Sequence, residues 1–89
     1  MITKEYLKDT RIRVNPEQSR KVQELAFSLG FAWAGDEKKL RYLNKPFLFL
    51  NNMYICYCSD ESYFNDSNKK EIFYKDLFPK ITDWRAEFK

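Results

Sequence analysis

The stretch NPEQSRKVQELAFSLG, residues Asn15 to Gly30, is the strongest structural signal in this chain. Asn15 is a favourable N-cap, Pro16 fits the first helical position, and Gln18 completes a capping box. Apolar side chains then recur at the spacing of one helix face, at Val22, Leu25, Ala26 and Leu29. Gly30 suits the left-handed residue that ends a helix. We therefore predict a helix over residues 16–29 with this stripe facing the core.

Short extended segments surround the predicted helix. Before it, residues 11–14 read Arg-Ile-Arg-Val, and this alternation of polar and apolar side chains predicts a strand. After it, residues 31–33 predict a short strand and residues 39–43 a further extended piece. Gly35 and Asp36 predict the turn between them. The helix is therefore expected to pack on a sheet built from both sides of the sequence.

Residues 47–58 predict a β-hairpin with unusual composition. Strands are expected over 47–50 and 53–58, joined by a type I′ turn at Asn51 and Asn52. No charged residue occurs from Phe47 to Ser59, so both faces of the hairpin are apolar. An antiparallel sheet with one solvated face alternates polar and apolar residues instead. We therefore expect the second face to be covered by another subunit, in a homo-oligomer, or by the C-terminal helix.

The remaining segments complete an α+β prediction. Residues 59–64 begin with a cap-like serine and predict one helical turn, and residues 71–74 predict a last strand. Ile81, Trp84 and Phe88 fall at helical spacing and predict a short amphipathic helix over residues 80–89. The expected fold is one long helix packed on a mainly antiparallel sheet of about four to five strands, with that short C-terminal helix. Residues 1–9 are expected to attach loosely to a single domain spanning 1–89.

Size and composition narrow the class of protein. The 89 residues suffice for one domain, and 44% apolar with 18% aromatic content is too hydrophobic for a disordered chain. No apolar run approaches the roughly 20 residues of a membrane span, and no signal region follows the first charges. We expect a cytoplasmic protein without a membrane partner. A net charge of +3 is too small to predict duplex DNA binding.

Catalytic and metal-binding patterns are absent from the sequence. The chain has no His, only two glycines, and no glycine-rich phosphate loop. Cys56 and Cys58 are two apart in a predicted strand, where their side chains lie parallel and poorly placed for a disulfide. We interpret both as reduced, buried thiols without redox or metal function. The sequence therefore predicts a binding protein, neither an enzyme nor a carrier of a cofactor.

Groups suited to binding a small phosphate-bearing ligand are well supplied. Aromatic faces on which a base can stack are expected at Trp33, Tyr42 and Tyr57. Residues 1–45 carry a charge of +4, with cations for phosphates at Arg11, Arg13, Lys38, Lys39 and Arg41. Ser59 and Ser62 stand beside a predicted helix start, which is a frequent anion site. The alternative is that the aromatics belong to the core and the cations solvate a surface.

The order of these segments resembles small accessory proteins of tailed bacteriophages. The segments that carry the resemblance are residues 11–14, 22–33, 59–64 and 70–74, followed by Asp76-Leu77. In those proteins a strand leads into a helix that ends in Leu-Gly-aromatic-x-Trp, and a hairpin follows. Some phage proteins of this size are anti-CBASS or anti-Thoeris sponges, which sequester cyclic-nucleotide defence signals. The resemblance implies a phage-encoded immune-evasion protein that acts in the bacterial host cytoplasm.

Two functions of different classes follow. The first is a sponge that holds a cyclic nucleotide or related phosphate-bearing ligand without cleaving it. The second is a protein-binding inhibitor that uses the hairpin face, Phe27 or the surface around Trp84 and Phe88 against a host protein. Binding of single-stranded nucleic acid is a third alternative, which fits the small net charge less well.

Overall fold

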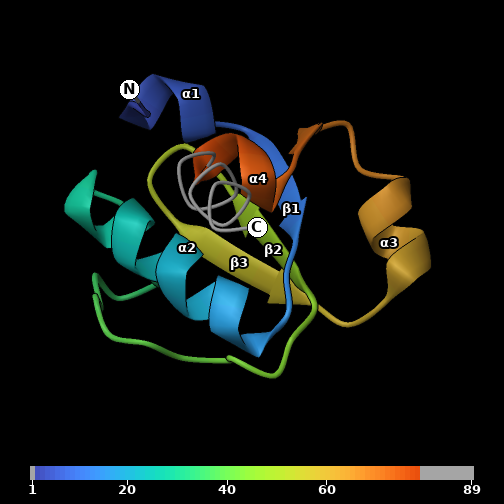
Figure 1. Ribbon diagram of the computed structural model, residues 1–89, viewed down its shortest axis with the longest axis horizontal. Helices are drawn as coiled ribbons and strands as arrows, with labels where there is room; N and C mark the ends of the chain where they lie inside the picture. Colours follow the sequence, from blue (N-terminus) through green and yellow to red (C-terminus); the bar gives the residue numbers. More distant parts are fainter. Residues whose placement is uncertain (1, 79–89) are drawn as a thin grey trace, which may run out of the picture.

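A computed structural model describes residues 2–78 and places them in an α+β fold (Figure 1). A four-stranded sheet has the strand order β3-β2-β1-β4. In chain order the elements are α1 (Lys4–Leu7), β1 (Thr10–Arg13), α2 (Pro16–Ser28), β2 (Phe47–Leu50), β3 (Ile55–Cys58), α3 (Glu61–Asn65), β4 (Lys70–Ile72) and α4 (Tyr74–Leu77). The predicted α+β class is confirmed, with α2, at 13 residues, the longest helix described. The helix expected over residues 80–89 lies outside the described residues.

The sheet combines antiparallel and parallel pairing. β1 pairs antiparallel with β2, and β2 pairs antiparallel with β3. β4 returns to the free edge of β1 and pairs parallel with it, Ile12 beside Ile72. The sheet is therefore mixed, with antiparallel pairs in the majority. Strands far apart in the sequence, β1 and β4, thus become neighbours.

Both ends of α2 are set by residues close to them in the sequence. The Asn15 side chain accepts a hydrogen bond from the Gln18 backbone N–H at 2.8 Å, and the Gln18 side chain accepts from the Asn15 N–H at 3.1 Å. Gly30 follows the helix with φ of +102°, the left-handed conformation that favours glycine. The predicted helix is confirmed to within one residue at its C-terminal end.

The buried face of α2 is rotated from the predicted stripe. The fully buried helix residues are Ser19, Val22, Gln23 and Ala26, whereas Leu25 and Leu29 are only partly buried. Phe27, which the sequence offered as a contact for a host protein, is partly buried and packs against the core. Hydrogen bonding explains the rotation: Gln23 is satisfied inside the protein, so its burial carries no desolvation penalty.

The two faces of the sheet are covered by different helices. On the α2 face, Ile12, Leu48, Leu50 and Ile72 pack in one core with the helix. On the opposite face, Phe47 and Phe49 of β2 pack against Phe64 of α3. Figure 1 shows α2 and α3 to either side of β1. Among the described residues, therefore, α3 contributes the cover expected from another subunit or from the C-terminal helix, and the homo-oligomer stays a prediction.

The hairpin turn differs from the type I′ turn that was predicted. That turn needs positive φ at both central residues, and neither Asn51 nor Asn52 has it. Instead the Asn51 N–H donates to the Tyr54 carbonyl at 2.9 Å, which moves the turn one residue along the chain. Ala32 explains the shift, because it donates to the Met53 carbonyl at 3.1 Å and accepts from the Ile55 N–H at 2.9 Å. Instead of the predicted strand, the segment 31–33 thus forms two isolated bridges, one from Ala32 to Tyr54 before β3 and one from Trp33 to Glu37.

Three other segments depart from expectation. Residues 39–43 form no strand and belong to a long loop. The predicted last strand is shorter than expected, since Tyr74 already begins α4. In the N-terminal segment, Leu7 of α1 is completely buried in the core, so this segment is attached by more than loose contacts.

No helix within residues 2–78 has the length and apolar character needed to cross a membrane.

Candidate functional site

A cavity of about 410 Å³ lies between the outer edge of β3 and the loop that follows Trp33. Its lining combines aromatic side chains, those of Trp33, Tyr42 and Tyr57, with the charged side chains of Glu37 and Arg41. We call these five residues and the cavity they line the aromatic pocket. Its volume falls within the range of small-molecule sites, which is about 300–1,000 Å³.

The three aromatic rings form one packed group. The Tyr42 and Tyr57 rings are stacked, with centroids 4.2 Å apart and planes at 28°. Trp33 meets both rings edge-on, at 5.0 Å from Tyr42 and 6.4 Å from Tyr57. Trp33 is only 5% exposed, whereas Tyr42 and Tyr57 are 37% and 40% exposed. Two tyrosines are therefore accessible to a planar ligand, with the indole beneath them as a rigid base.

Strand register and the bridge of Ala32 with Tyr54 place these rings together. Tyr57 pairs with Leu48 and so points to the α2 face of the sheet, but from the edge strand, where the helix covers it less. Ala32 is held against β3, and this contact fixes the neighbouring Trp33. Beyond Trp33 the chain turns through Gly35 and Asp36, both at positive φ, as predicted for this turn.

A buried glutamine anchors the loop that carries Arg41 and Tyr42. The Gln23 side chain donates to the Arg41 carbonyl at 2.7 Å and accepts from the Arg41 N–H at 3.0 Å. Its Nε2 also lies 3.0 Å from the Ser19 hydroxyl. Tyr42 follows with φ of +53°, a conformation that few residues with side chains adopt. Gln23 was not predicted as a site residue, although a Ser and a Gln four apart on one helix face can bond to each other.

Cations gather at the rim of the aromatic pocket. The Arg41 guanidinium lies 5.5 Å from the Tyr42 ring centroid, and Lys45 Nζ lies 5.5 Å from that of Tyr57. Lys38 and Lys39 are exposed on the same loop. Arg41 also forms an ion pair with Glu37, both side chains being more than one third exposed. An exposed pair of this kind is weak and easily exchanged for a stronger partner.

One polar group of the pocket lacks a partner. Trp33 Nε1 is buried and makes no hydrogen bond within residues 2–78, a property it shares with Arg11 Nε. Indole is a donor only, and an unpaired buried donor is costly. Trp33, a residue of the pocket lining, therefore carries one unsatisfied donor that is closed to solvent.

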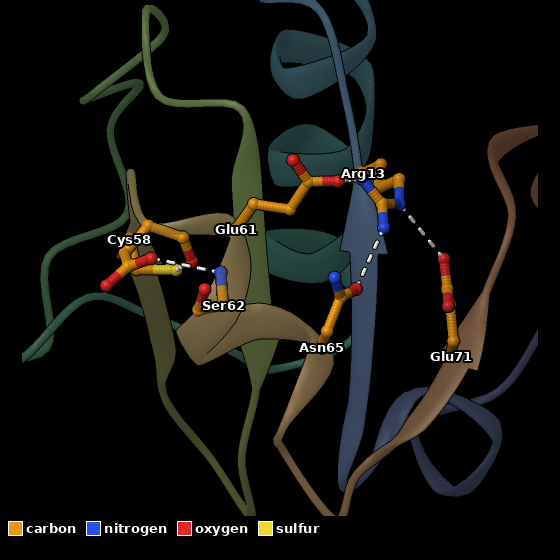
Figure 2. A network of polar contacts seen from close by, with 7 residues as sticks. Arg13, Cys58, Glu61, Ser62, Asn65 and Glu71 are labelled. Carbon is orange, nitrogen blue, oxygen red and sulfur yellow. Dashed lines mark hydrogen bonds and ion pairs between the residues drawn. The ribbon is translucent and has the colours of Figure 1, made fainter.

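Arg11 and Arg13, which the sequence suggested as phosphate ligands, lie on the opposite face of the sheet. Arg13 reaches Asn65 at 2.9 Å, Glu61 at 3.3 Å and Glu71 at 3.4 Å (Figure 2). The Arg11 guanidinium donates to the Ser67 carbonyl and lies 5.2 Å from the Phe64 ring centroid. Both arginines thus tie α3 to the sheet, and neither lines the aromatic pocket.

Ser59 and Ser62 do not line the aromatic pocket either. Asp60, and not Ser59, caps α3, because its carboxylate accepts from the Ser62 N–H at 2.9 Å. Ser62 lies on α3 near Cys58, on the side of the Arg13 network (Figure 2). Of the ten residues suggested by the sequence, Trp33, Arg41, Tyr42 and Tyr57 line the cavity, and Lys38 and Lys39 lie on its loop.

The cysteines are free thiols in more open positions than predicted. Cys56 is exposed and Cys58 partly exposed, because both point away from the α2 core, at a strand on the edge of the sheet. Asn51 Nδ2 lies 3.2 Å from the Cys56 sulfur. Across residues 2–78 there is no cluster of three metal-ligating side chains.

A scan against protein-family models, a search of curated proteins and a search of solved structures find no match to this chain.

Proposed function

We propose that the protein binds a small nucleotide-like ligand in the aromatic pocket and holds it without cleaving it. The observation that carries this proposal is the convergence of Trp33, Tyr42 and Tyr57 with Arg41 around one cavity. Stacking of a base on an aromatic side chain contributes about 1–3 kcal/mol. Arginine adds a planar, permanently charged donor that suits phosphate. The aromatic rings would thus contact the base, and Arg41 would contact the phosphate.

The particular ligand we favour is a cyclic nucleotide used as a bacterial defence signal. The resemblance to phage accessory proteins supports this choice, and it makes the protein an immune-evasion sponge in the host cytoplasm. Lys45 lies beside the Tyr57 ring, and Lys38 and Lys39 are exposed on the same loop; these cations favour ligands with more than one phosphate. Sequestration needs tight binding but no catalytic group, in keeping with a chain that lacks histidine.

Calorimetry of the purified protein against cyclic dinucleotides and cyclic ADP-ribose isomers tests the proposal. We expect at least one of them to bind, and to be recovered chemically unchanged after denaturation. Arg41→Ala should weaken binding by about ten- to a hundredfold, because a charge-assisted hydrogen bond contributes about 1.5–3 kcal/mol. Lys70→Ala is the matched control, since Lys70 lies on β4 at the other edge of the sheet. The proposal would be contradicted if none of these ligands bound, or if Arg41→Ala and Lys70→Ala lost affinity equally.

A second candidate function is binding of a host protein through exposed aromatic side chains. Tyr63 on α3 is 63% exposed and Phe73 before α4 is 50% exposed. Aromatic residues are enriched at protein interfaces, where they bury large areas. The alternative surface around Trp84 and Phe88 lies outside the described residues. Capture of a host protein that Tyr63→Ala abolishes and Tyr57→Ala spares would favour this function over the first.

A further inference from the structure

We propose that the aromatic pocket selects guanine over adenine, with the Glu37 carboxylate accepting from the N1–H and N2–H groups of the base and Trp33 Nε1 donating to its O6 oxygen. This inference rests on the proposed function, because it specifies which nucleotide base the pocket takes. Three features carry it: the backbone pairing of Trp33 with Glu37, the unpartnered indole N–H, and the exchangeable ion pair between Glu37 and Arg41.

Backbone pairing fixes Trp33 and Glu37 as neighbours. The Trp33 N–H donates to the Glu37 carbonyl at 2.8 Å, and the Glu37 N–H donates to the Trp33 carbonyl at 3.3 Å. The two residues thus form an antiparallel bridge. Directly paired residues of this kind project their side chains to the same side, with Cβ atoms about 4.5–5.5 Å apart. Trp33 and Glu37, which both line the cavity, are therefore neighbours.

The hydrogen-bonding pattern of this pair matches one purine edge. Guanine presents the O6 acceptor next to the N1–H and N2–H donors, so O6 can face Trp33 while both donors face Glu37. Adenine presents an amino donor where guanine has O6, and an acceptor nitrogen where guanine has N1–H. Its amino group would face the indole N–H, and its ring nitrogen would face the carboxylate. Both contacts are unfavourable for adenine, which gives the pocket its selectivity.

When a nucleotide binds, the ion pair between Glu37 and Arg41 breaks, and both side chains become available to the ligand. Glu37 and Arg41 are more than one third exposed, so their mutual attraction is screened by solvent. A phosphate can accept two parallel hydrogen bonds from the Arg41 guanidinium, whereas Glu37 accepts only one. Binding then moves Arg41 from Glu37 to the phosphate and leaves the carboxylate available to the base.

Access to the indole nitrogen requires one ring to move. Trp33 Nε1 is closed to solvent, so a ligand atom reaches it only after a neighbouring side chain shifts. Tyr42 is the neighbour suited to this, since it is 37% exposed and packs edge-on against Trp33. The base then stacks on Tyr57 in the place that Tyr42 vacates.

Calorimetry of the full chain with guanosine, inosine and adenosine monophosphates tests the base assignment. We expect guanosine monophosphate to bind at least about tenfold more tightly than the adenosine compound, since each mispaired edge loses a full contact. The inosine compound keeps O6 and N1–H but lacks the 2-amino group, so its affinity should fall between them. Equal affinities for guanine and adenine would overturn the base assignment and leave nucleotide binding intact. Absence of binding by all three compounds and by their cyclic dinucleotides would overturn both proposals.

The variant Glu37→Gln separates base recognition from a merely electrostatic role. If the carboxylate accepts from guanine, this variant lowers guanosine monophosphate affinity about tenfold or more and spares the adenosine compound. If Glu37 only occupies Arg41, the same variant raises the affinity for both, and that result overturns the inference. The exposed position of Glu37 keeps the fold intact, and Glu24→Gln on the exposed side of α2 is the matched control. Trp33→Phe, which keeps a buried ring, should reduce the preference for guanine over adenine.

Discussion

The two faces of the sheet use the same kinds of side chain in opposite ways. On the α3 face, Arg11 and Arg13 lie 5.2 and 4.9 Å from the centroid of the Phe64 ring. On the α2 face, Arg41 lies 5.5 Å from the centroid of Tyr42. In the first group the Phe64 ring is completely buried and packs against Phe47 and Phe49 of the sheet. In the second, a cavity of about 410 Å³ remains open.

The difference shows that a cation beside an aromatic ring does not by itself mark a binding site. Arg13 has three polar side-chain partners, on α3 and β4, so its charge is already used to hold the fold together. Arg41 has one exposed side-chain partner, Glu37, next to the cavity. We therefore assign a structural role to the α3 face, whereas the binding role of the aromatic pocket is our proposal. The following variants test that division.

The largest effect is expected from Phe64→Ala on the α3 face. Phe64 is completely buried between Phe47, Phe49 and the two arginines, so its truncation should destabilise the protein by about 3–5 kcal/mol. Urea unfolding followed by circular dichroism measures this loss. Tyr63→Ala, the exposed neighbour on the same helix, should cost no more than about 0.5–1 kcal/mol. Equal losses in the two variants would mean that α3 does not hold the second face through Phe64.

A smaller stability loss with a clear loss of binding is expected from Gln23→Leu. The change leaves the Arg41 N–H and carbonyl without their buried partner, at a cost of about 1–3 kcal/mol. Arg41 and Tyr42 should then lose their fixed positions, so nucleotide affinity should fall in the fraction that stays folded. Glu24→Leu, at the next, exposed position of α2, is the control. Unchanged affinity in Gln23→Leu would remove Gln23 from the support of the pocket.

Arg13→Ala is expected to show directly that the two faces of the sheet have different roles. Its ion pairs are exposed and its contact with Phe64 is of the cation–π type, so the loss should be about 1 kcal/mol of stability. Nucleotide affinity should not change, in contrast to Arg41→Ala. Thermal unfolding and calorimetry on the two variants provide the comparison. A loss of affinity in Arg13→Ala would show that the α3 face takes part in binding.

The smallest effect is expected at alkaline pH, on the contribution of Tyr74 to the free energy of unfolding. Burial, and secondarily the charge of Glu17, raise the pKa of Tyr74 above its usual value. The folded protein therefore keeps this proton where the unfolded chain, with a pKa of about 10, has begun to lose it. The resulting contribution to stability is complete below about pH 10 and is lost as pH rises through the folded pKa. The difference in unfolding free energy between the protein and Tyr74→Phe, measured from pH 8 to 11, should change in that sense; a constant difference would contradict it.

Elements specified by neighbouring residues were predicted well. The capping residues Asn15 and Gln18 and the terminating Gly30 placed α2 to within one residue, because each acts over three or four positions. The alternation around Ile12 likewise predicted β1. The turn at Asn51 and Asn52 was wrong, because Ala32, some twenty positions earlier, bonds to Met53 and Ile55 and sets the turn.

The candidate site was predicted only in part. Trp33, Arg41, Tyr42 and Tyr57 do meet, but Arg11 and Arg13 lie on the other face. Arg11 and Arg13 are two positions apart on one strand, so the sequence indicates that they share a face of the sheet. It does not show which aromatic residues lie on that face. Gln23 was missed because a polar residue on an amphipathic helix is normally assigned to the solvent side.

The sequence by itself determined the residue types available for binding and the local elements, since caps, glycines and period-two patterns act within a few residues. The tertiary structure decided which cations became structural and which remained beside a cavity. That choice depends on strand register, which puts Tyr57 opposite Leu48 and Arg13 opposite Phe47. A shift of one residue would exchange the faces of every side chain on a strand. Pairing between strands that are distant in the sequence sets that register and so separates the two arginine–aromatic groups.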